Sequence, residues 1–154
     1  MAIPPPQPGL VFRYEYAWKR DVLAGKEAAK QRPACIVLAV RREAGDTQVL
    51  IVPITHMPPS PDVLAMEIPP KVKAYLGLDG ARSWVILSEA NIDMWPTPDM
   101  RPIPGGGFKY GLLPTKMVNL IRDTILSNIR EKRLPVVDRG KGSILPAAQN
   151  KPTA

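Results

Sequence analysis

Two polar residues flank a pair of apolar runs in a way that suits the binding of a phosphate group. Arg32 stands just before the run 34–40, and Thr55 closes the run 47–55. Both runs are rich in Val and Ile, and the polar segment 41–46 between them completes the pattern of a β-hairpin. Antiparallel pairing brings Arg32 and Thr55 to the same end of such a hairpin. A guanidinium and a hydroxyl at one sheet edge can hold a phosphate through charge-assisted hydrogen bonds.

The basic residues gather around this hairpin and in the last quarter of the chain. The formal charge of the 154 residues is +7. Segments 19–42 and 116–154 each carry a net charge of +5, whereas 61–115 carries −1. The first block surrounds Arg32 and favours a polyanionic partner whose binding depends on salt. The alternative interpretation is a solvated surface that keeps the protein in solution.

The other apolar segments predict a mostly β fold. A first strand is predicted over 9–16, and its aromatic residues Phe12, Tyr14 and Tyr16 share one face. Core packing is the favoured role for Tyr14, and stacking on unpaired bases is the alternative for Tyr14, Tyr16 and Trp18. Short strands are further predicted over 63–68, 83–87, 91–95 and 108–113.

One long helix is predicted near the end of the chain, over 114–133. Pro114 and Thr115 form a start signal. An apolar stripe suited to packing against a sheet is formed by Val118, Ile121, Ile125 and Ile129. A second, short helix over 71–76 is expected to end at Gly77. Between the first strand and Arg32, segment 18–31 is predicted to be a flexible loop, with a short helical turn over 22–30 as the alternative.

These elements predict one domain with a small antiparallel barrel. The connections are too short for repeated helical crossovers, so parallel βαβ units are not expected. We therefore expect a mostly β fold with one long C-terminal helix, spanning 9–133. Residues 1–8 are expected to be a disordered Pro-rich lead, and 134–154 a disordered tail with few large apolar groups.

The composition bears on location and on cofactors. No apolar run reaches the roughly 20 residues that a membrane span needs, and the first residues lack the pattern of a signal peptide. These observations favour a cytoplasmic protein. Cys35, the one cysteine, lies in an apolar run and is expected to be a small buried hydrophobe. With one histidine and none of the common nucleotide or metal motifs, we expect no cofactor and no metal site.

The order of these motifs resembles the MazF/PemK family of bacterial toxins. That family opens with a glycine and an apolar strand, matched here by 9–14. It continues with Arg-Pro before a Val-rich strand and with Pro-x-Thr at the end of the next, matched by Arg32-Pro33 and Pro53-Ile54-Thr55. In some members a glycine and a glutamate precede the arginine, and Gly25 and Glu27 stand at those positions. The match covers residues 9–131, including a late strand over 83–95.

The resemblance implies a fold, an activity and partners. The fold would be an SH3-like barrel that forms a homodimer and binds a cognate antitoxin. The activity would be metal-independent cleavage of single-stranded RNA, as an mRNA interferase of a type II toxin–antitoxin system. In such a reaction the 2′-hydroxyl attacks the adjacent phosphate, and the product ends in a 2′,3′-cyclic phosphate. Two alternatives remain open: a same-fold toxin directed at DNA gyrase, and a catalytically silent barrel that binds nucleic acid.

The candidate site residues have different expected roles in that reaction. Arg32 would stabilise charge on the phosphoryl oxygens, and Thr55 would donate a hydrogen bond to one of them. Proton transfer would fall to Glu27 or His56, because an arginine stays protonated and a threonine is too weak an acid. RNA contacts are expected from Trp18, Lys19, Lys26 and Lys30.

Each candidate also has a structural alternative. Arg32 would otherwise pair with an acidic neighbour, and Thr55 would be a plain strand-end hydroxyl. Glu27 would be a solvated loop charge, and His56 a surface histidine on the far side of its strand. Trp84 and Trp95 are expected in the core or at a dimer interface.

Overall fold

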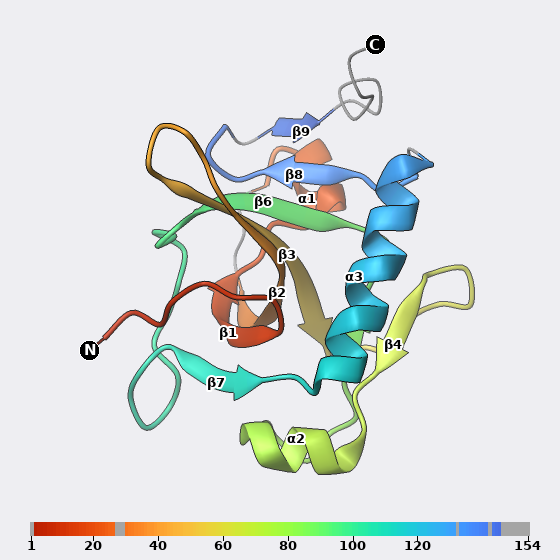
Figure 1. The fold of residues 1–154 in the computed structure, drawn as a ribbon. Coiled ribbons are helices and arrows are strands. Elements are labelled where there is room, and N and C mark those ends of the chain that lie inside the picture. Colours follow the sequence, from red (N-terminus) through yellow and green to blue (C-terminus); the bar gives the residue numbers. More distant parts are fainter. Residues whose placement is uncertain (1, 27–29, 132, 142, 146–154) are drawn as a thin grey trace.

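The computed structural model describes residues 2–26, 30–131, 133–141 and 143–145. Within these ranges the fold is mostly β, with nine strands in one mixed sheet and a long helix, α3 (Thr115–Arg130), near the C-terminus (Figure 1). The mostly β composition and the late helix are therefore confirmed. No helix among the described residues is long and apolar enough to cross a membrane.

Seven of the nine strands correspond to predicted segments, with ends that differ from the prediction by up to three residues, and the last two lie in the segment predicted to be a tail. The strands are β1 (Leu10–Glu15), β2 (Gln31–Arg41), β3 (Thr47–Thr55), β4 (Ala65–Glu67), β5 (Trp84–Ile86), β6 (Ala90–Trp95), β7 (Lys109–Leu112), β8 (Val136–Asp138) and β9 (Ser143–Leu145). The sheet order is β7-β1-β2-β3-β6-β8-β9, and β5 pairs with both β3 and β4. For the described residues, the pairing leaves β7 and β9 as separate edges and does not close into a barrel.

The predicted hairpin is the centre of the sheet. β2 and β3 pair in antiparallel register, with Ala34 opposite Pro53, Cys35 opposite Val52 and Arg41 opposite Thr47. Two residues beyond the pair Ala34–Pro53, the same register sets Arg32 opposite Thr55, at the open end of the hairpin. The middle of each strand is buried, as expected for core strands without polar alternation.

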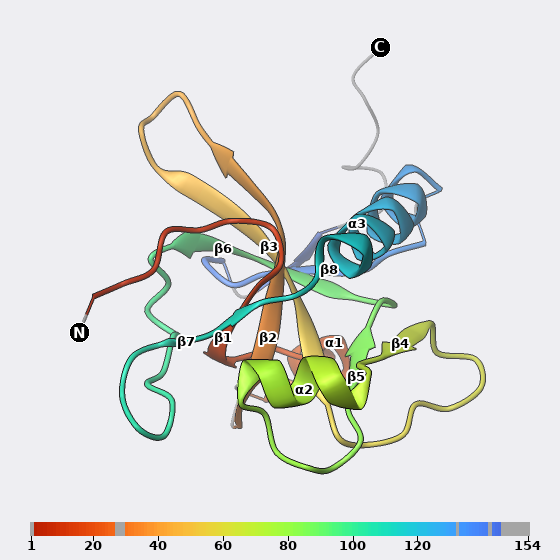
Figure 2. The same ribbon diagram turned by 60° about the horizontal axis from the view of Figure 1, so that its bottom comes forward.

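Each face of the sheet carries its own apolar cluster, because successive side chains of a strand point to opposite sides. The predicted stripe of α3 covers one face, where Ile121 and Ile125 are buried against β-strand residues such as Val52 (Figure 2). The other face holds the aromatic residues Phe12, Tyr14 and Tyr16, and all three are buried, which confirms the core role predicted for Tyr14.

The two short helices lie beside the sheet. Helix α2 (Pro70–Leu76) ends as predicted at Gly77, which has a left-handed φ of +70°. Helix α1 (Lys19–Leu23) lies in the segment predicted to be a flexible loop, and it begins earlier than the alternative helical turn over 22–30. Residues 22 and 23 of that predicted turn are helical, and 27–29 lie outside the described residues.

The prediction of a disordered tail is wrong for the described residues of 134–145. Leu134, Val136 and Val137 are buried, and β8 pairs with the free edge of β6. This pairing is parallel, so the sheet is mixed, and the expectation of antiparallel strands alone needs correction. The physical reason is that β6 offers unpaired backbone groups beside an apolar surface, which even a short, sparse strand can cover. Residues 146–154 lie outside the described part of the chain.

The N-terminal lead has no regular secondary structure over residues 2–7, but it is held against the sheet. Pro4 is buried, and its carbonyl accepts a hydrogen bond of 3.0 Å from the Trp95 indole. The expectation of a disordered lead is therefore wrong at this point of contact. Trp84 is buried in β5, and Trp95 packs edge-on against Phe12, in line with core roles.

Cys35 is buried, as its apolar surroundings predicted. Burial raises the pKa of the thiol to about 12, and a backbone hydrogen bond from Gly9 offsets this in part. A thiol with so high a pKa stays protonated near neutral pH, which excludes the thiolate that a nucleophilic cysteine requires.

Gly9 lies directly before β1 and against helix α3, and we expect that it does not tolerate a side chain. Its φ is +91°, and a Cβ placed there would lie 2.6 Å from Cγ2 of Val118. We expect Gly9→Ala to lower the free energy of unfolding by about 2–4 kcal/mol, from backbone strain and overpacking together. Urea unfolding measures this loss.

Gly45 provides a matched control because it has the same φ of +91° and nothing within 4 Å of a built Cβ. Gly45→Ala should cost only the backbone share, about 1–2 kcal/mol. Equal losses in the two variants would contradict a steric role for Val118.

Candidate functional site

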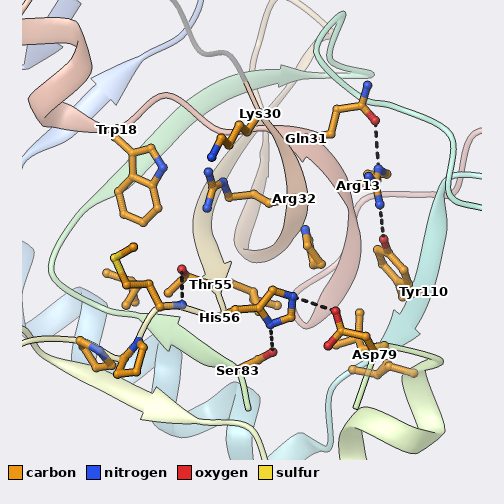
Figure 3. Close-up of a pocket in the computed structure, with 18 of the residues that line it drawn as sticks. Arg13, Trp18, Lys30, Gln31, Arg32, Thr55, His56, Asp79, Ser83 and Tyr110 are labelled. Atoms are coloured by element: carbon orange, nitrogen blue, oxygen red, sulfur yellow. Dashed lines mark hydrogen bonds and ion pairs between the residues drawn. The ribbon is translucent and has the colours of Figure 1, made fainter. Parts of the chain in front are cut away.

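Arg32 and Thr55 line one open pocket of about 1170 Å³ at the end of the central hairpin (Figure 3). The chain segments that contribute to this pocket come from far apart in the sequence. They include the end of β3, the loop after α2, and the segments around Glu89 and Tyr110. The sequence prediction that the hairpin brings Arg32 and Thr55 to one end of the sheet is confirmed.

The Arg32 guanidinium lies over the ring of Trp18. Its Cζ lies 5.2 Å from the centre of the Trp18 ring, and that of Arg20 lies 5.0 Å from the same ring. The Nε atom of Arg32 is buried without a hydrogen-bond acceptor, as is Trp18 Nε1. Among the described residues, no carboxylate forms an ion pair with Arg32, so the alternative of a structural ion pair finds no partner there.

Burial lowers the pKa of Arg32 from its ordinary value, and the nearby charge of Arg20 lowers it further, while Asp21 and Tyr16 act in the opposite sense. The direction of this shift means that the protein destabilises the positive charge of Arg32. An anion bound in the pocket would relieve that cost. The unpaired Nε–H and the half-buried charge together make Arg32 a candidate anion-binding group of the pocket.

The two residues at the end of β3 both face the pocket. Thr55 Oγ1 accepts a hydrogen bond of 3.1 Å from the backbone N–H of Met57, which leaves its own hydroxyl hydrogen available to a ligand. The His56 ring is exposed beside it, with Nε2 at 2.8 Å from Asp79 Oδ2 and Nδ1 at 3.2 Å from Ser83 Oγ. Sequence alternation would send Thr55 and His56 to opposite faces, but β3 ends at Thr55 and the chain turns there.

The pocket is basic. Its charged lining consists of Arg13, Arg20, Lys30, Arg32 and Lys109 against Asp79 and Glu89. Five permanent cations against two carboxylates create a positive field that attracts a polyanion. The concentration of basic residues over 19–42 therefore corresponds to a real surface feature, although Lys109 and Arg13 come from outside that block.

The structure separates the predicted RNA-contacting residues. Trp18 and Lys30 line the pocket, whereas Lys19 and Lys26 are not part of its lining. The Lys19 backbone N–H donates to Glu89 Oε1 at 2.9 Å. Glu27 lies outside the described residues.

Glu89 is a pocket residue that the sequence reasoning missed. Its Oε1 accepts hydrogen bonds from the Tyr16 hydroxyl at 3.2 Å and from the Lys19 N–H. Burial raises the pKa of this carboxyl, and the hydrogen bonds from Lys19 and Tyr16 offset only part of the rise. A carboxyl with a raised pKa in a cleft is suited to proton transfer. The one available signal was its place just before the strand predicted at 91–95.

A row of polar side chains closes the opposite side of the pocket and was also missed. Arg13 donates to Gln31 Oε1 at 3.0 Å and to the Tyr110 hydroxyl at 3.1 Å (Figure 3). Arg13 lies between two buried aromatic residues of β1, so it points away from the aromatic cluster. That alternation was visible in the sequence, but which residues lie across from it depends on how β1 pairs with β7.

No group of three or more His, Cys, Asp or Glu side chains arranged to hold a metal ion is found in the described part of the chain. No protein-family model, no curated protein and no solved structure matches this chain. A functional assignment therefore depends on the residues of the pocket and on the motif resemblance.

Proposed function

We propose that this chain is an endoribonuclease of the MazF/PemK kind, which cleaves single-stranded RNA without a metal ion. The observation that carries the proposal is the convergence of Arg32, Thr55 and Trp18 in one basic pocket. These are residue types that can bind a phosphate and an unpaired base. The open shape of the pocket and its span across several strands suit a flexible single strand better than a small metabolite.

The proposed reaction uses the 2′-hydroxyl of the substrate as the nucleophile. Its oxygen attacks the adjacent phosphorus, the bond to the 5′-oxygen breaks, and a 2′,3′-cyclic phosphate forms. Arg32 stabilises the negative charge that develops on the phosphoryl oxygens, and no carboxylate of the described residues pairs with its guanidinium. Thr55 donates its free hydroxyl hydrogen to one of those oxygens.

Two pocket residues are suited to move the protons of this reaction. Glu89 can accept the proton of the 2′-hydroxyl, since a carboxyl with a raised pKa is a stronger base than an ordinary one. His56 can protonate the leaving 5′-oxygen, because imidazole is the side chain whose ordinary titration range lies closest to neutral pH. Glu27, the other carboxylate considered from sequence, stays a candidate from the sequence alone.

The proposal includes further properties that the resemblance implies. The curved sheet would be an SH3-like small barrel, the protein would act as a homodimer in the cytoplasm, and a cognate antitoxin would bind it. These properties fit a basic pocket that must be blocked while the toxin is held inactive. An acidic antitoxin segment would bind such a pocket through the same cations that bind RNA.

Cleavage of a mixed single-stranded RNA by the purified protein in EDTA tests the proposal. We expect discrete fragments that end in 2′,3′-cyclic phosphate. Intact RNA together with growth arrest on expression would point to the gyrase-directed alternative. Salt-dependent RNA binding without cleavage and without growth arrest would point to a silent nucleic-acid-binding barrel.

The pH dependence of cleavage tests the role of Glu89. Because the pKa of Glu89 is raised, its carboxylate form becomes populated only at a pH above the ordinary pKa of a glutamate. We expect kcat of the wild type to rise with pH through this titration. Glu89→Gln should lose the rise and about 10²-fold to 10⁴-fold in kcat.

Glu43, exposed in the turn between β2 and β3, supplies the control for this experiment. Glu43→Gln should retain both the rate and the pH profile of the wild type. An unchanged pH profile in Glu89→Gln would show that another group removes the proton.

A further inference from the structure

His56 belongs to a closed ring of four polar side chains beside the phosphate-binding residues. Lys73 Nζ donates to Asp79 Oδ1 at 3.1 Å and to Ser83 Oγ at 2.8 Å. His56 completes the ring, because its Nε2 faces Asp79 Oδ2 at 2.8 Å and its Nδ1 faces Ser83 Oγ at 3.2 Å. Lys73 comes from α2, and Asp79 and Ser83 from the segment that follows it. His56 comes directly after β3, and Figure 3 shows it with Asp79 and Ser83.

When the imidazole is neutral, only one assignment of donors and acceptors satisfies all four contacts of this ring. Lys73 can only donate, and an ionised Asp79 can only accept. His56 Nε2 must therefore carry a hydrogen to meet the carboxylate. Nδ1 then has a free lone pair, which accepts the hydroxyl hydrogen of Ser83, while the Ser83 oxygen accepts from Lys73.

The ring is anchored by its buried members. Lys73 is 5 % exposed, and its three donors go to Asp79, Ser83 and the Ala81 carbonyl. Burial acts to raise the pKa of Asp79, but the Lys73 hydrogen bond and the neighbouring His56 outweigh it and hold that pKa below its ordinary value. The carboxylate is therefore present near neutral pH and ready to accept from the imidazole.

A hydrolase triad would use the same three residue types as Ser83, His56 and Asp79, but the burial of the serine argues against that role. Ser83 is 1 % exposed, and its oxygen already accepts a hydrogen bond from Lys73. A nucleophile must reach an electrophilic atom of a substrate, which a covered hydroxyl does not do. The ring is better suited to orient the exposed imidazole.

We propose that Lys73 and Asp79 are positioning residues that hold the neutral imidazole of His56 in one tautomer, with the hydrogen on Nε2 and the lone pair on Nδ1. When Nδ1 takes up a proton, the Arg82 carbonyl, 3.3 Å away, is at hand to accept it in a hydrogen bond. The catalytic consequence rests on the proposed RNA cleavage, whereas the tautomer itself does not.

The chain contains a single histidine, so its imidazole can be observed without assignment ambiguity. We expect long-range ¹H–¹⁵N correlation spectra of the free protein, recorded at a pH where the ring is neutral, to show one tautomer with Nε2 protonated. Asp79→Ala should move both nitrogen shifts toward the average of a freely exchanging histidine. Ser83→Ala should shift the Nδ1 resonance more than the Nε2 resonance, because Ser83 Oγ faces Nδ1.

Two further variants keep this test decisive. Asp46→Ala removes a carboxylate that pairs with Arg42 at the far turn of the hairpin, and it should leave the imidazole spectrum unchanged. If Asp79→Ala does not fold because Lys73 loses its partner, Lys73→Met/Asp79→Ala removes both charges and should show the same shift change. A wild-type spectrum of mixed tautomers, or an Asp79 variant with the wild-type spectrum, would overturn the proposal.

Kinetics then separate this proposal from that of RNA cleavage. We expect Asp79→Ala to lower kcat by about tenfold to a hundredfold with little change in KM, because a mobile imidazole is a poorer proton donor. Absence of cleavage by the wild type would reject the proposed activity, and the spectra would still decide whether the ring holds the tautomer. An unchanged kcat beside an altered spectrum would limit the ring to a structural role.

Discussion

Arg32→Ala should abolish RNA cleavage while leaving the protein folded. Arg32 is the candidate anion-binding group of the pocket, because no other described arginine is both half-buried there and unpaired. Loss of a single donor to a developing oxyanion costs about 10²-fold to 10³-fold in rate. The loss of the whole cation should therefore reach at least that range. Single-turnover cleavage of a defined RNA at saturating enzyme measures it.

Two other arginine variants sharpen this test. Arg32→Lys keeps a positive charge but loses the planar pair of donors, so it should recover only part of the rate. Arg42→Ala removes an exposed arginine at the far turn of the hairpin and should cleave RNA like the wild type. Full activity in Arg32→Ala would reject the nuclease mechanism proposed here.

The stability of a third variant, Arg32→Met, distinguishes a functional role of Arg32 from a structural one. The pKa of Arg32 is lowered by burial first and by Arg20 second, so its charge costs folding energy in the free protein. We expect Arg32→Met to keep or raise the free energy of unfolding, by up to about 1 kcal/mol, since functional groups often cost stability. A clear loss of stability would indicate that Arg32 instead supports the fold.

Removal of the residues after Arg133 should cost much of the stability of the fold. It takes away the buried side chains of Leu134, Val136 and Val137 and exposes the edge of β6. At about 1.5–3 kcal/mol for each buried apolar side chain, the loss is roughly 4–9 kcal/mol. That range overlaps the roughly 5–15 kcal/mol by which whole domains are stable.

The reference for this truncation is a chain that ends at Leu145, which retains every described residue. Thermal and urea unfolding of the two proteins isolate the contribution of 134–145. Full-length protein with Val136→Asp should lose stability in the same direction, because it buries a charge without a partner. Equal stability of the two truncated chains would contradict the packing role of β8.

Local patterns in the sequence were enough to predict the central part of this protein. Val- and Ile-rich runs flanking a polar turn predict a buried hairpin, and a 3.6-residue apolar period predicts α3, because both patterns are set by neighbouring residues. The position of Arg32 and Thr55 at one sheet end follows from antiparallel pairing alone. These features depend on residues that are close in the chain, so the sequence by itself determined them.

Other features were decided only by the tertiary structure. The segment after Arg133 has short apolar runs at 134–137 and 144–145, and their burial depends on the free edge of β6, which lies far away in the chain. Glu89, Asp79 and Ser83 reach the pocket because β5 and α2 return to the end of β3. No local pattern encodes which distant side chains will meet. The pKa of Glu89 likewise depends on burial, which is a property of the assembled fold and not of the residue.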